Sequence, residues 1–101
     1  MTERQVSVFF YGSFINLDVL KQAGLELDGF RVAQLHAWDI HIGPLATLMP
    51  KANAVVYGTV VECTHAELDR LYSQDWVGGY LPEAVVVEVD RAFLPALTYV
   101  K

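Results

Sequence analysis

Residues 6–14 read VSVFFYGSF, and this stretch sets how the fold is expected to begin. Val6 to Tyr11 is apolar at almost every position and is bounded by Gly12. A nearly continuous apolar run of this length predicts a central strand that is covered on both faces. Asn16 is a suitable N-cap for a short helix over residues 17–23. The chain is therefore expected to open with a strand, a glycine turn and a short helix.

Strand composition continues over residues 30–42, where the apolar alternation changes phase. A regular strand keeps its parity, so the change predicts a bulge or sharp bend near residues 34–36. A short extended piece at residues 45–49, a turn at 50–53 and a long strand at 54–62 are expected next. Gly58 lies inside that long strand and indicates a bend or a close backbone approach.

A capped helix and two more strands complete the expected elements. Thr64 and Glu67 fit a capping box, and the helix that follows carries Leu68, Leu71 and Tyr72 on one face. The last strands are expected at residues 84–89 and 96–100. The order β-α-β-β-β-α-β-β predicts an α+β protein: a mixed, strongly curled or nearly closed sheet with two short helices.

Composition limits the class of protein. The 101 residues, 53% of them hydrophobic and 19% charged, suit a single domain spanning residues 1–101. A net charge of -5 argues against nucleic-acid and peripheral-membrane partners. The single cysteine, Cys63, excludes an internal disulfide and a multi-cysteine zinc site. With no secretory or membrane-spanning segment visible, a cytoplasmic protein is expected.

The turn at Gly12, Ser13 and Phe14 is the first candidate site. A glycine turn between a buried strand and a helix presents several backbone N–H groups at one point, which can bind a carboxylate or stabilise an oxyanion. An ordinary strand-to-helix turn explains the same residues. Ser13 does not match a triad nucleophile, because the G-x-S-x-G pattern is absent.

Asp75 is the second candidate. It follows Leu68, Leu71 and Tyr72 at the spacing of one helical face, where an apolar side chain is expected. Burial and the negative end of the helix would both raise the pKa of its carboxyl, which suits a general base. The alternative is that the helix has already ended and that Asp75 is a solvated loop residue.

Metal and thiol chemistry find little support in the sequence. In a strand, His36 faces the opposite side from Asp39 and His41, so these three do not form a ligand set. Cys63 and His65 lie on either side of a helix cap, with nothing to orient the imidazole. Neither a metal site nor a catalytic cysteine is therefore expected from these residues.

Several short motifs resemble the gamma-glutamylcyclotransferase-like superfamily. Residues 11–14, YGSF, resemble its YGSL or YGSN loop, and residues 57–60, YGTV, resemble its second strand. Leu68-Asp69 resembles the family's "LD" helix, and Gly79-Tyr80 before the valines of residues 85–87 resembles its "gY" and the strand after it. These matches occur in the family order across nearly the whole chain.

The resemblance implies a barrel-like mixed sheet with helices beside a cavity. It also implies an intramolecular aminolysis that converts a γ-glutamyl amine into 5-oxoproline and a free amine, without metal or cofactor. A carboxylate of raised pKa would serve as base, while backbone N–H groups hold the substrate and the oxyanion. The substrate-binding residues implied by the resemblance are Tyr11, Gly12, Ser13, Phe14 and Tyr80.

The sequence departs from the family at the catalytic glutamate. Without a gap Tyr72 stands at its position, with a longer helix Asp75 does, and Glu83 is a further acid. A tyrosine is almost wholly protonated at neutral pH and is a poor base. The arginine that often follows the "gY" tyrosine is also absent, since Leu81 follows Tyr80.

Three functions stay open at this point. The first is a cyclotransferase with Asp75 as base. The second is a non-catalytic relative that binds a small carboxylate. The third is an assembly domain with a vestigial cavity. Fold alone does not separate them, and the sequence leaves the oligomeric state open.

Overall fold

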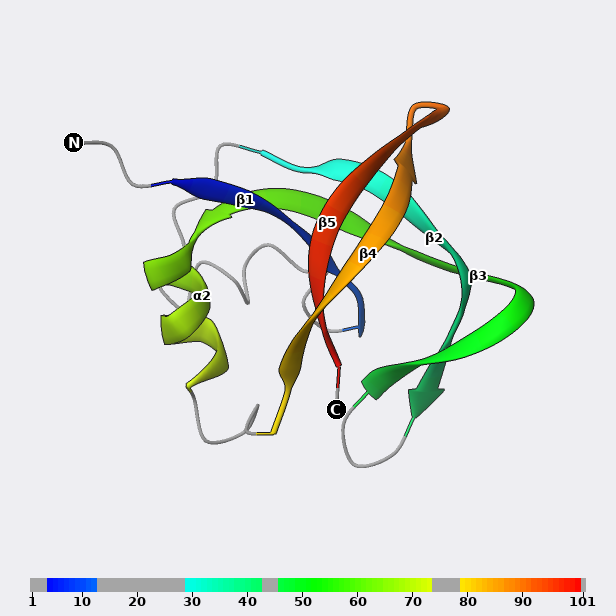
Figure 1. Cartoon of the computed structure of the whole chain (residues 1–101), viewed down its shortest axis with the longest axis horizontal. Helices are drawn as coiled ribbons and strands as arrows, with labels where there is room; N and C mark the ends of the chain where they lie inside the picture. The colour runs from blue at the N-terminus through cyan, green and yellow to red at the C-terminus, as the bar shows by residue number, and fades with distance from the viewer. Residues whose placement is uncertain (1–3, 13–28, 43–45, 74–78, 101) are drawn as a thin grey trace.

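The computed structural model describes residues 4–12, 29–42, 46–73 and 79–100. Its elements in chain order are β1 (Gln5–Phe10), β2 (Arg31–Ile42), β3 (Ala46–Thr64), α2 (His65–Tyr72), β4 (Leu81–Val89) and β5 (Ala92–Val100) (Figure 1). The α+β class expected from the sequence is confirmed. The helix expected over residues 17–23 lies outside the described residues.

The strands close into a barrel in the order β1-β3-β2-β4-β5. Neighbouring strands are antiparallel, except that β1 and β5 run parallel where they close the barrel at Val8 and Leu97. The prediction of a mixed, strongly curled sheet is thus confirmed.

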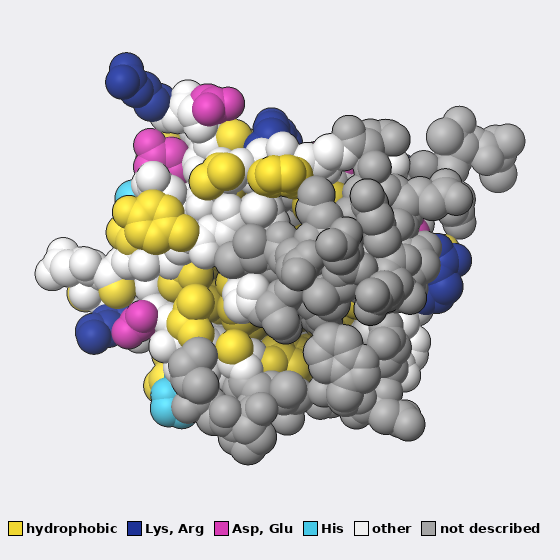
Figure 2. All heavy atoms as spheres, turned by 180° about the vertical axis from the view of Figure 1, so that it is seen from behind, with side chains coloured by type: hydrophobic (Ala, Val, Ile, Leu, Met, Phe, Trp, Pro, Cys, Tyr) yellow, Lys and Arg dark blue, Asp and Glu magenta, His cyan; other side chains and the backbone are white. Residues whose placement is uncertain are grey.

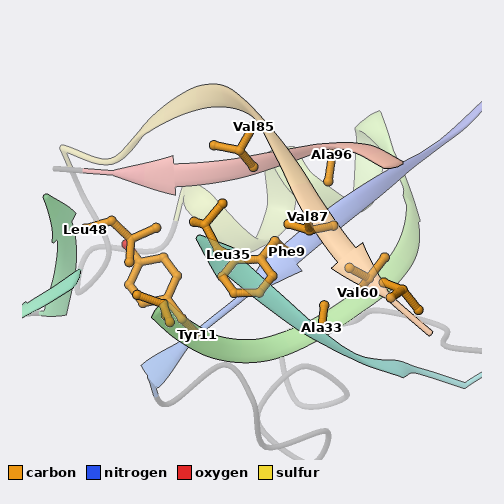
Figure 3. Packing of buried hydrophobic residues seen from close by; sticks show 11 residues of the cluster. Phe9, Tyr11, Ala33, Leu35, Leu48, Val60, Val85, Val87 and Ala96 are labelled. Carbon is orange, nitrogen blue, oxygen red and sulfur yellow. The ribbon is translucent and has the colours of Figure 1, made fainter. Parts of the chain in front are cut away.

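Strand β1 is buried on both faces, as its apolar run predicts. Phe9 belongs to the cluster of buried side chains inside the barrel, where Leu35, Val60 and Val87 surround it (Figure 3). Val8 joins a second cluster on the other face, together with residues of α2. A strand between two apolar layers gains burial energy from both sides, which favours the centre of the fold.

Helix α2 begins at the predicted capping box. Thr64 Oγ1 accepts from the Glu67 amide at 3.1 Å, and Glu67 Oε1 accepts from the Thr64 amide at 2.9 Å. These two bonds satisfy amides that the first helical turn leaves free. Leu68 and Leu71 are buried in the second cluster, so the helix covers the outer face of β1.

The hairpin of β2 and β3 breaks its register midway. Ala37, which takes a left-handed φ of 67°, lies at the register shift between His36 and Trp38. On β3, residues 51–54 have no partner in the β2 ladder, and Asn53 is left-handed as well, with φ 65°. The bend predicted near residues 34–36 therefore exists, and it lies at the next residue, Ala37.

The prediction of a turn at residues 50–53 is wrong. The chain does not reverse there, and β3 runs as one strand from residue 46 to residue 64. The reason is pairing: residues on both sides of the interruption bond to the same partner, β2. Turn-forming residues thus produce a sharp curve of β3, visible at the right of Figure 1, instead of a chain reversal.

Several large hydrophobic side chains stay exposed on the barrel surface, and Figure 2 shows such side chains on one face of the molecule. Tyr57 and Phe93 are among them. No helix within the described ranges is long and apolar enough to cross a membrane.

Candidate functional site

The end of β1 lies against the beginning of β3. Gly12 has a left-handed φ of 64°, and a Cβ built on it would lie 3.5 Å from the Cβ of Ala46. Glycine adopts this conformation without steric cost, so the chain can leave the strand in a tight turn. In Figure 1 the β2–β3 hairpin curves back, so that the start of β3 approaches the end of β1.

Tyrosines from separate elements gather beside Gly12, and we call Tyr11, Tyr72, Tyr80 and Tyr99 the tyrosine cluster. The rings of Tyr72 and Tyr99 are stacked, with centroids 3.7 Å apart and planes at 14°. The ring centroid of Tyr80 lies 6.1 Å from that of Tyr72. Tyr11 donates its hydroxyl to the carbonyl of Tyr99 at 2.6 Å. The cluster therefore joins the ends of β1, α2 and β5 to the segment before β4.

Two phenols of the cluster also bind the tip of the β2–β3 hairpin. The Tyr80 hydroxyl donates to the carbonyl of Ala46. The Tyr11 side chain is hydrogen-bonded to Thr47. The first residues of β3 are thus held next to the cluster by side chains that come from distant parts of the sequence.

The phenols of the cluster are neutral at neutral pH. Burial raises the pKa of Tyr11 to about 12; the nearby Tyr80 phenol raises it too, and the bond to Thr47 lowers it. Burial, reinforced by the neighbouring phenols, also raises the pKa of Tyr72 far above its usual range. The pKa values of Tyr80 and Tyr99 are raised as well, chiefly by burial. A neutral phenol can donate a hydrogen bond to an anion, but it cannot serve as a base.

Hydrophobic side chains lie on the barrel side of the tyrosine cluster. Leu48 of β3 is buried, and Figure 3 shows it beside the ring of Tyr11. Trp38 and Ile40 of β2 are partly buried against the hydrophobic cluster inside the barrel, to which Leu48 and Tyr11 belong. The site therefore combines the hydroxyl groups of the tyrosines with hydrophobic side chains, which suits a small ligand that has a polar end and a methylene chain.

Three of the predicted site residues lie in described parts of the chain, and the structure brings them together. Tyr11, Gly12 and Tyr80 meet around the tip of β3. Ser13, Phe14 and Asp75 lie outside the described residues. The ligand-binding role of all these residues stays a prediction.

The helical count that led to Asp75 does not hold. Helix α2 ends at Tyr72, with Ser73 as its C-cap and the Ser73 amide bonded to the Asp69 carbonyl at 3.0 Å. A residue beyond this cap is not placed by helical periodicity. The position of Asp75 therefore depends on the segment after the helix.

The other described acids near α2 and β4 have different roles. Glu83 is exposed on β4, as expected from its place near the start of that strand. Glu67 is buried but bonded to the helix cap. Asp69 is exposed, and its charge helps to raise the pKa of Tyr99. Among the described residues no group of three His, Cys, Asp or Glu side chains could hold a metal ion.

Sequence reasoning missed the contributions of β3 and β5. Ala46, Thr47 and Leu48 lie in a segment predicted only as a short extended piece, and Tyr99 lies in the last strand. Their distance along the chain from Tyr11, up to 88 residues, gives no local signal. Only the closure of the barrel brings them to the site.

Comparison with solved structures identifies the fold of this chain. No family model matches the sequence, and no curated protein matches it. Solved structures do: the chain has the gamma-glutamyl cyclotransferase-like fold. The resemblance found in the sequence is thereby confirmed at the level of the fold.

Individual structures show how far the similarity extends. A gamma-glutamyl cyclotransferase is similar with a TM-score of 0.82 and 20% identity, over 96% of this chain and 66% of that chain. A protein from Arabidopsis thaliana has a TM-score of 0.80 and 24% identity, over 99% of this chain and 70% of that chain. An uncharacterized Homo sapiens protein has a TM-score of 0.79 and 22% identity, over 97% and 67% respectively. The chain thus spans about two thirds of the length of these three structures.

Proposed function

We propose that this chain binds a γ-glutamyl amine at the tyrosine cluster and converts it into 5-oxoproline and free amine. The observation that carries the proposal is the meeting of Tyr11, Gly12 and Tyr80, on a fold shared with a gamma-glutamyl cyclotransferase. These are residues that the sequence resemblance assigns to substrate binding. No metal or organic cofactor takes part in the proposed reaction.

In this proposal the ligand's polar end lies at the end of β1. Backbone N–H groups of the turn that begins at Gly12 bind its carboxylate. The methylene groups of the glutamyl chain pack on Leu48, which is buried beside Tyr11. A folded ligand held this way has its amine close to its own γ-carbonyl carbon, which favours ring closure.

The chemical step needs a base. The α-amino nitrogen must lose a proton before it forms a bond to the γ-carbonyl carbon. The amide bond from that carbon to the nitrogen of the leaving amine then breaks. Tyr72 is unsuited to take the proton because the pKa of its phenol is raised far above its usual range. Glu83 is exposed on β4. We therefore assign the base to Asp75, which returns the proton to the leaving amine.

A second function is favoured by one observation. Tyr72, the residue that stands at the place of the family's glutamate when the sequence is matched without a gap, is a neutral phenol in the tyrosine cluster. A chain that lost its base while keeping its hydrogen-bond donors would bind a small carboxylate without turning it over. The non-catalytic binder is therefore the alternative. An assembly domain with a vestigial cavity would neither bind nor turn over such ligands.

The test measures 5-oxoproline release from a panel of γ-glutamyl amines. Asp75→Asn is compared with the unaltered chain and with Asp90→Asn, an exposed acid in the turn between β4 and β5 that serves as the matched control. Loss of a general base is expected to slow release about a hundredfold to ten-thousandfold, while Asp90→Asn leaves it unchanged.

Binding of 5-oxoproline, followed by NMR, separates the other outcomes. Release that survives Asp75→Asn would remove Asp75 as base. Binding without release by the unaltered chain would support the carboxylate binder. Neither binding nor release would leave the assembly role.

A further inference from the structure

We propose that the outer part of the β2–β3 hairpin is a hinged gate over the tyrosine cluster. We call this part, residues 38–42 and 46–50, the distal arm. Its hinge lies at Ala37 and at residues 51–54, and its latch is the hydrogen bond from the Tyr80 hydroxyl to the Ala46 carbonyl. Tyr80 is thus a positioning residue that acts on the arm.

The hinge is visible in both strands at the same level of the hairpin. The β2–β3 ladder stops after His36 and Val55 and resumes at Trp38 and Pro50. In between, one residue of β2 faces a longer unpaired stretch of β3, and both carry a non-glycine residue in the left-handed region. The hairpin is expected to bend most easily at this level, because ladder hydrogen bonds are missing there while the strands stay paired on both sides of it.

The distal arm has no described ladder with the neighbouring strand β4. Strands β2 and β4 pair at Gln34 and Glu88, which lie on the barrel side of the hinge. Beyond the hinge, the amide of Ile40 bonds to the side chain of Asp39 at 2.9 Å. Among its described residues, the arm therefore lacks the backbone pairing that would fix it to β4.

Side chains hold the arm in place at its tip. The Tyr80 hydroxyl bonds to Ala46, and Tyr11 is hydrogen-bonded to Thr47. Near the hinge, Lys51 Nζ and Asp39 Oδ2 lie 3.6 Å apart, but both side chains are at least half exposed, and such pairs contribute little. Burial of Leu48, with the packing of Trp38, Ile40 and Ala46 against the interior cluster, supplies the rest of the attachment.

Lifting the arm would uncover the candidate site. Leu48 would leave the ring of Tyr11, and Ala46 would leave Gly12, where the predicted turn of amides begins. A ligand could then enter or leave, and closure would exclude water from it. The gating role depends on the proposed function, whereas the hinge and the latch do not.

The test compares thiols placed on the two sides of the hinge in the full chain. Leu48→Cys and Val56→Cys put a cysteine at buried positions of β3 that belong to the same interior cluster, one on the arm and one on the barrel. Cys63, which is fully buried in the other cluster, remains in both chains and reports global unfolding. The measurement is the rate of reaction with an aromatic disulfide reagent.

A hinged arm predicts that the new thiol of Leu48→Cys reacts at least about tenfold faster than that of Val56→Cys and faster than Cys63. Adding Tyr80→Phe, which removes the latch bond, should speed the Leu48→Cys reaction about fivefold without changing the other two. Tyr57→Phe, an exposed phenol outside the cluster, serves as the control and should change none of them.

Equal rates at the two positions would overturn the hinge, and no effect of Tyr80→Phe would overturn the latch. Saturating 5-oxoproline should slow the Leu48→Cys reaction if the arm closes over that ligand. Failure of this last effect alone, in a chain that binds 5-oxoproline, would overturn the gating role and leave the proposed function standing.

Discussion

A Cβ at position 58 would meet the carbonyl oxygen of Phe10 and would lie 2.7 Å from the Cζ of Phe9. Neither neighbour can easily yield, because Phe9 and Phe10 are buried on opposite faces of β1. Gly58→Ala is therefore expected to lower the free energy of unfolding by about 1–3 kcal/mol, the usual effect of overpacking.

Urea denaturation followed by circular dichroism measures the effect of Gly58→Ala. Ala52→Ser, an exposed change in the same strand, is the control and should stay within about 0.5 kcal/mol of the unaltered chain. Similar midpoints for the two variants would mean that β1 and β3 can separate enough to accept the methyl group.

Tyr11 gives a prediction at high pH. Its pKa is raised in the folded chain to about 12, against an ordinary value of 10.0. The folded state then holds its proton more tightly than the unfolded state does. This contribution to stability is complete below pH 10 and is lost as the pH rises from 10 towards 12.

The test of Tyr11 compares the unaltered chain with Tyr11→Phe. At pH 7 the variant should be about 1 kcal/mol less stable, because the bond to the Tyr99 carbonyl is lost. Above pH 10 its stability should fall less steeply than that of the unaltered chain. Parallel stability curves from pH 8 to pH 11 would contradict the raised pKa.

At the scale of elements, helix α2 depends on its first turn. It comprises only His65–Tyr72, which is too short to be stable in isolation. Thr64→Ala removes the oxygen that accepts from the Glu67 amide, and it is expected to lower stability by about 1 kcal/mol. Thermal and urea unfolding measure the change.

His65→Ala is the matched control for the cap, because His65 is the adjacent, exposed residue. Its effect should be within about 0.5 kcal/mol. Comparable losses for Thr64→Ala and His65→Ala would show that the capping bond contributes nothing particular to the helix.

At the scale of the whole molecule, the barrel closes where β5 meets β1. Thr98 is fully buried, and its Oγ1 donates to the carbonyl of Phe9 at 3.0 Å. Thr98→Val keeps the shape of the side chain but leaves that buried carbonyl without this donor. The expected loss of stability is about 1–3 kcal/mol, measured by urea unfolding.

Thr98→Ser helps to interpret the result, because it keeps the hydroxyl and loses one buried methyl group, worth about 1 kcal/mol. A Thr98→Val chain as stable as the unaltered one would mean that the closure depends on apolar packing and on the β1–β5 pairing alone.

Local signals were sufficient for most elements. The apolar run of β1 and the capping box at Thr64 each involve only a few neighbouring residues, so strand β1 and the start of helix α2 can be predicted from the sequence. The bend of β2 was found from its change of phase, but its position at Ala37 depends on where β3 also loses its pairing. For the same reason residues 50–53, which have turn composition, became a curve within a continuous strand.

The candidate site was predictable only in part. Tyr11, Gly12 and Tyr80 carry motif signals, and they do meet. The positions of Ala46 and Leu48 beside them arise from the folding back of the hairpin, which no local pattern expresses. Helical spacing does not extend to Asp75, because the helix ends at Tyr72 with Ser73 as its C-cap.

The amino-acid sequence by itself determined a small α+β barrel with a buried first strand, because hydrophobic periodicity and capping act between near neighbours. The tertiary structure alone decided that phenols from four segments would gather at the end of that strand, and that a hairpin would fold back across them. Contacts between residues up to 89 positions apart depend on closing the sheet, and closure is a property of all the strands together.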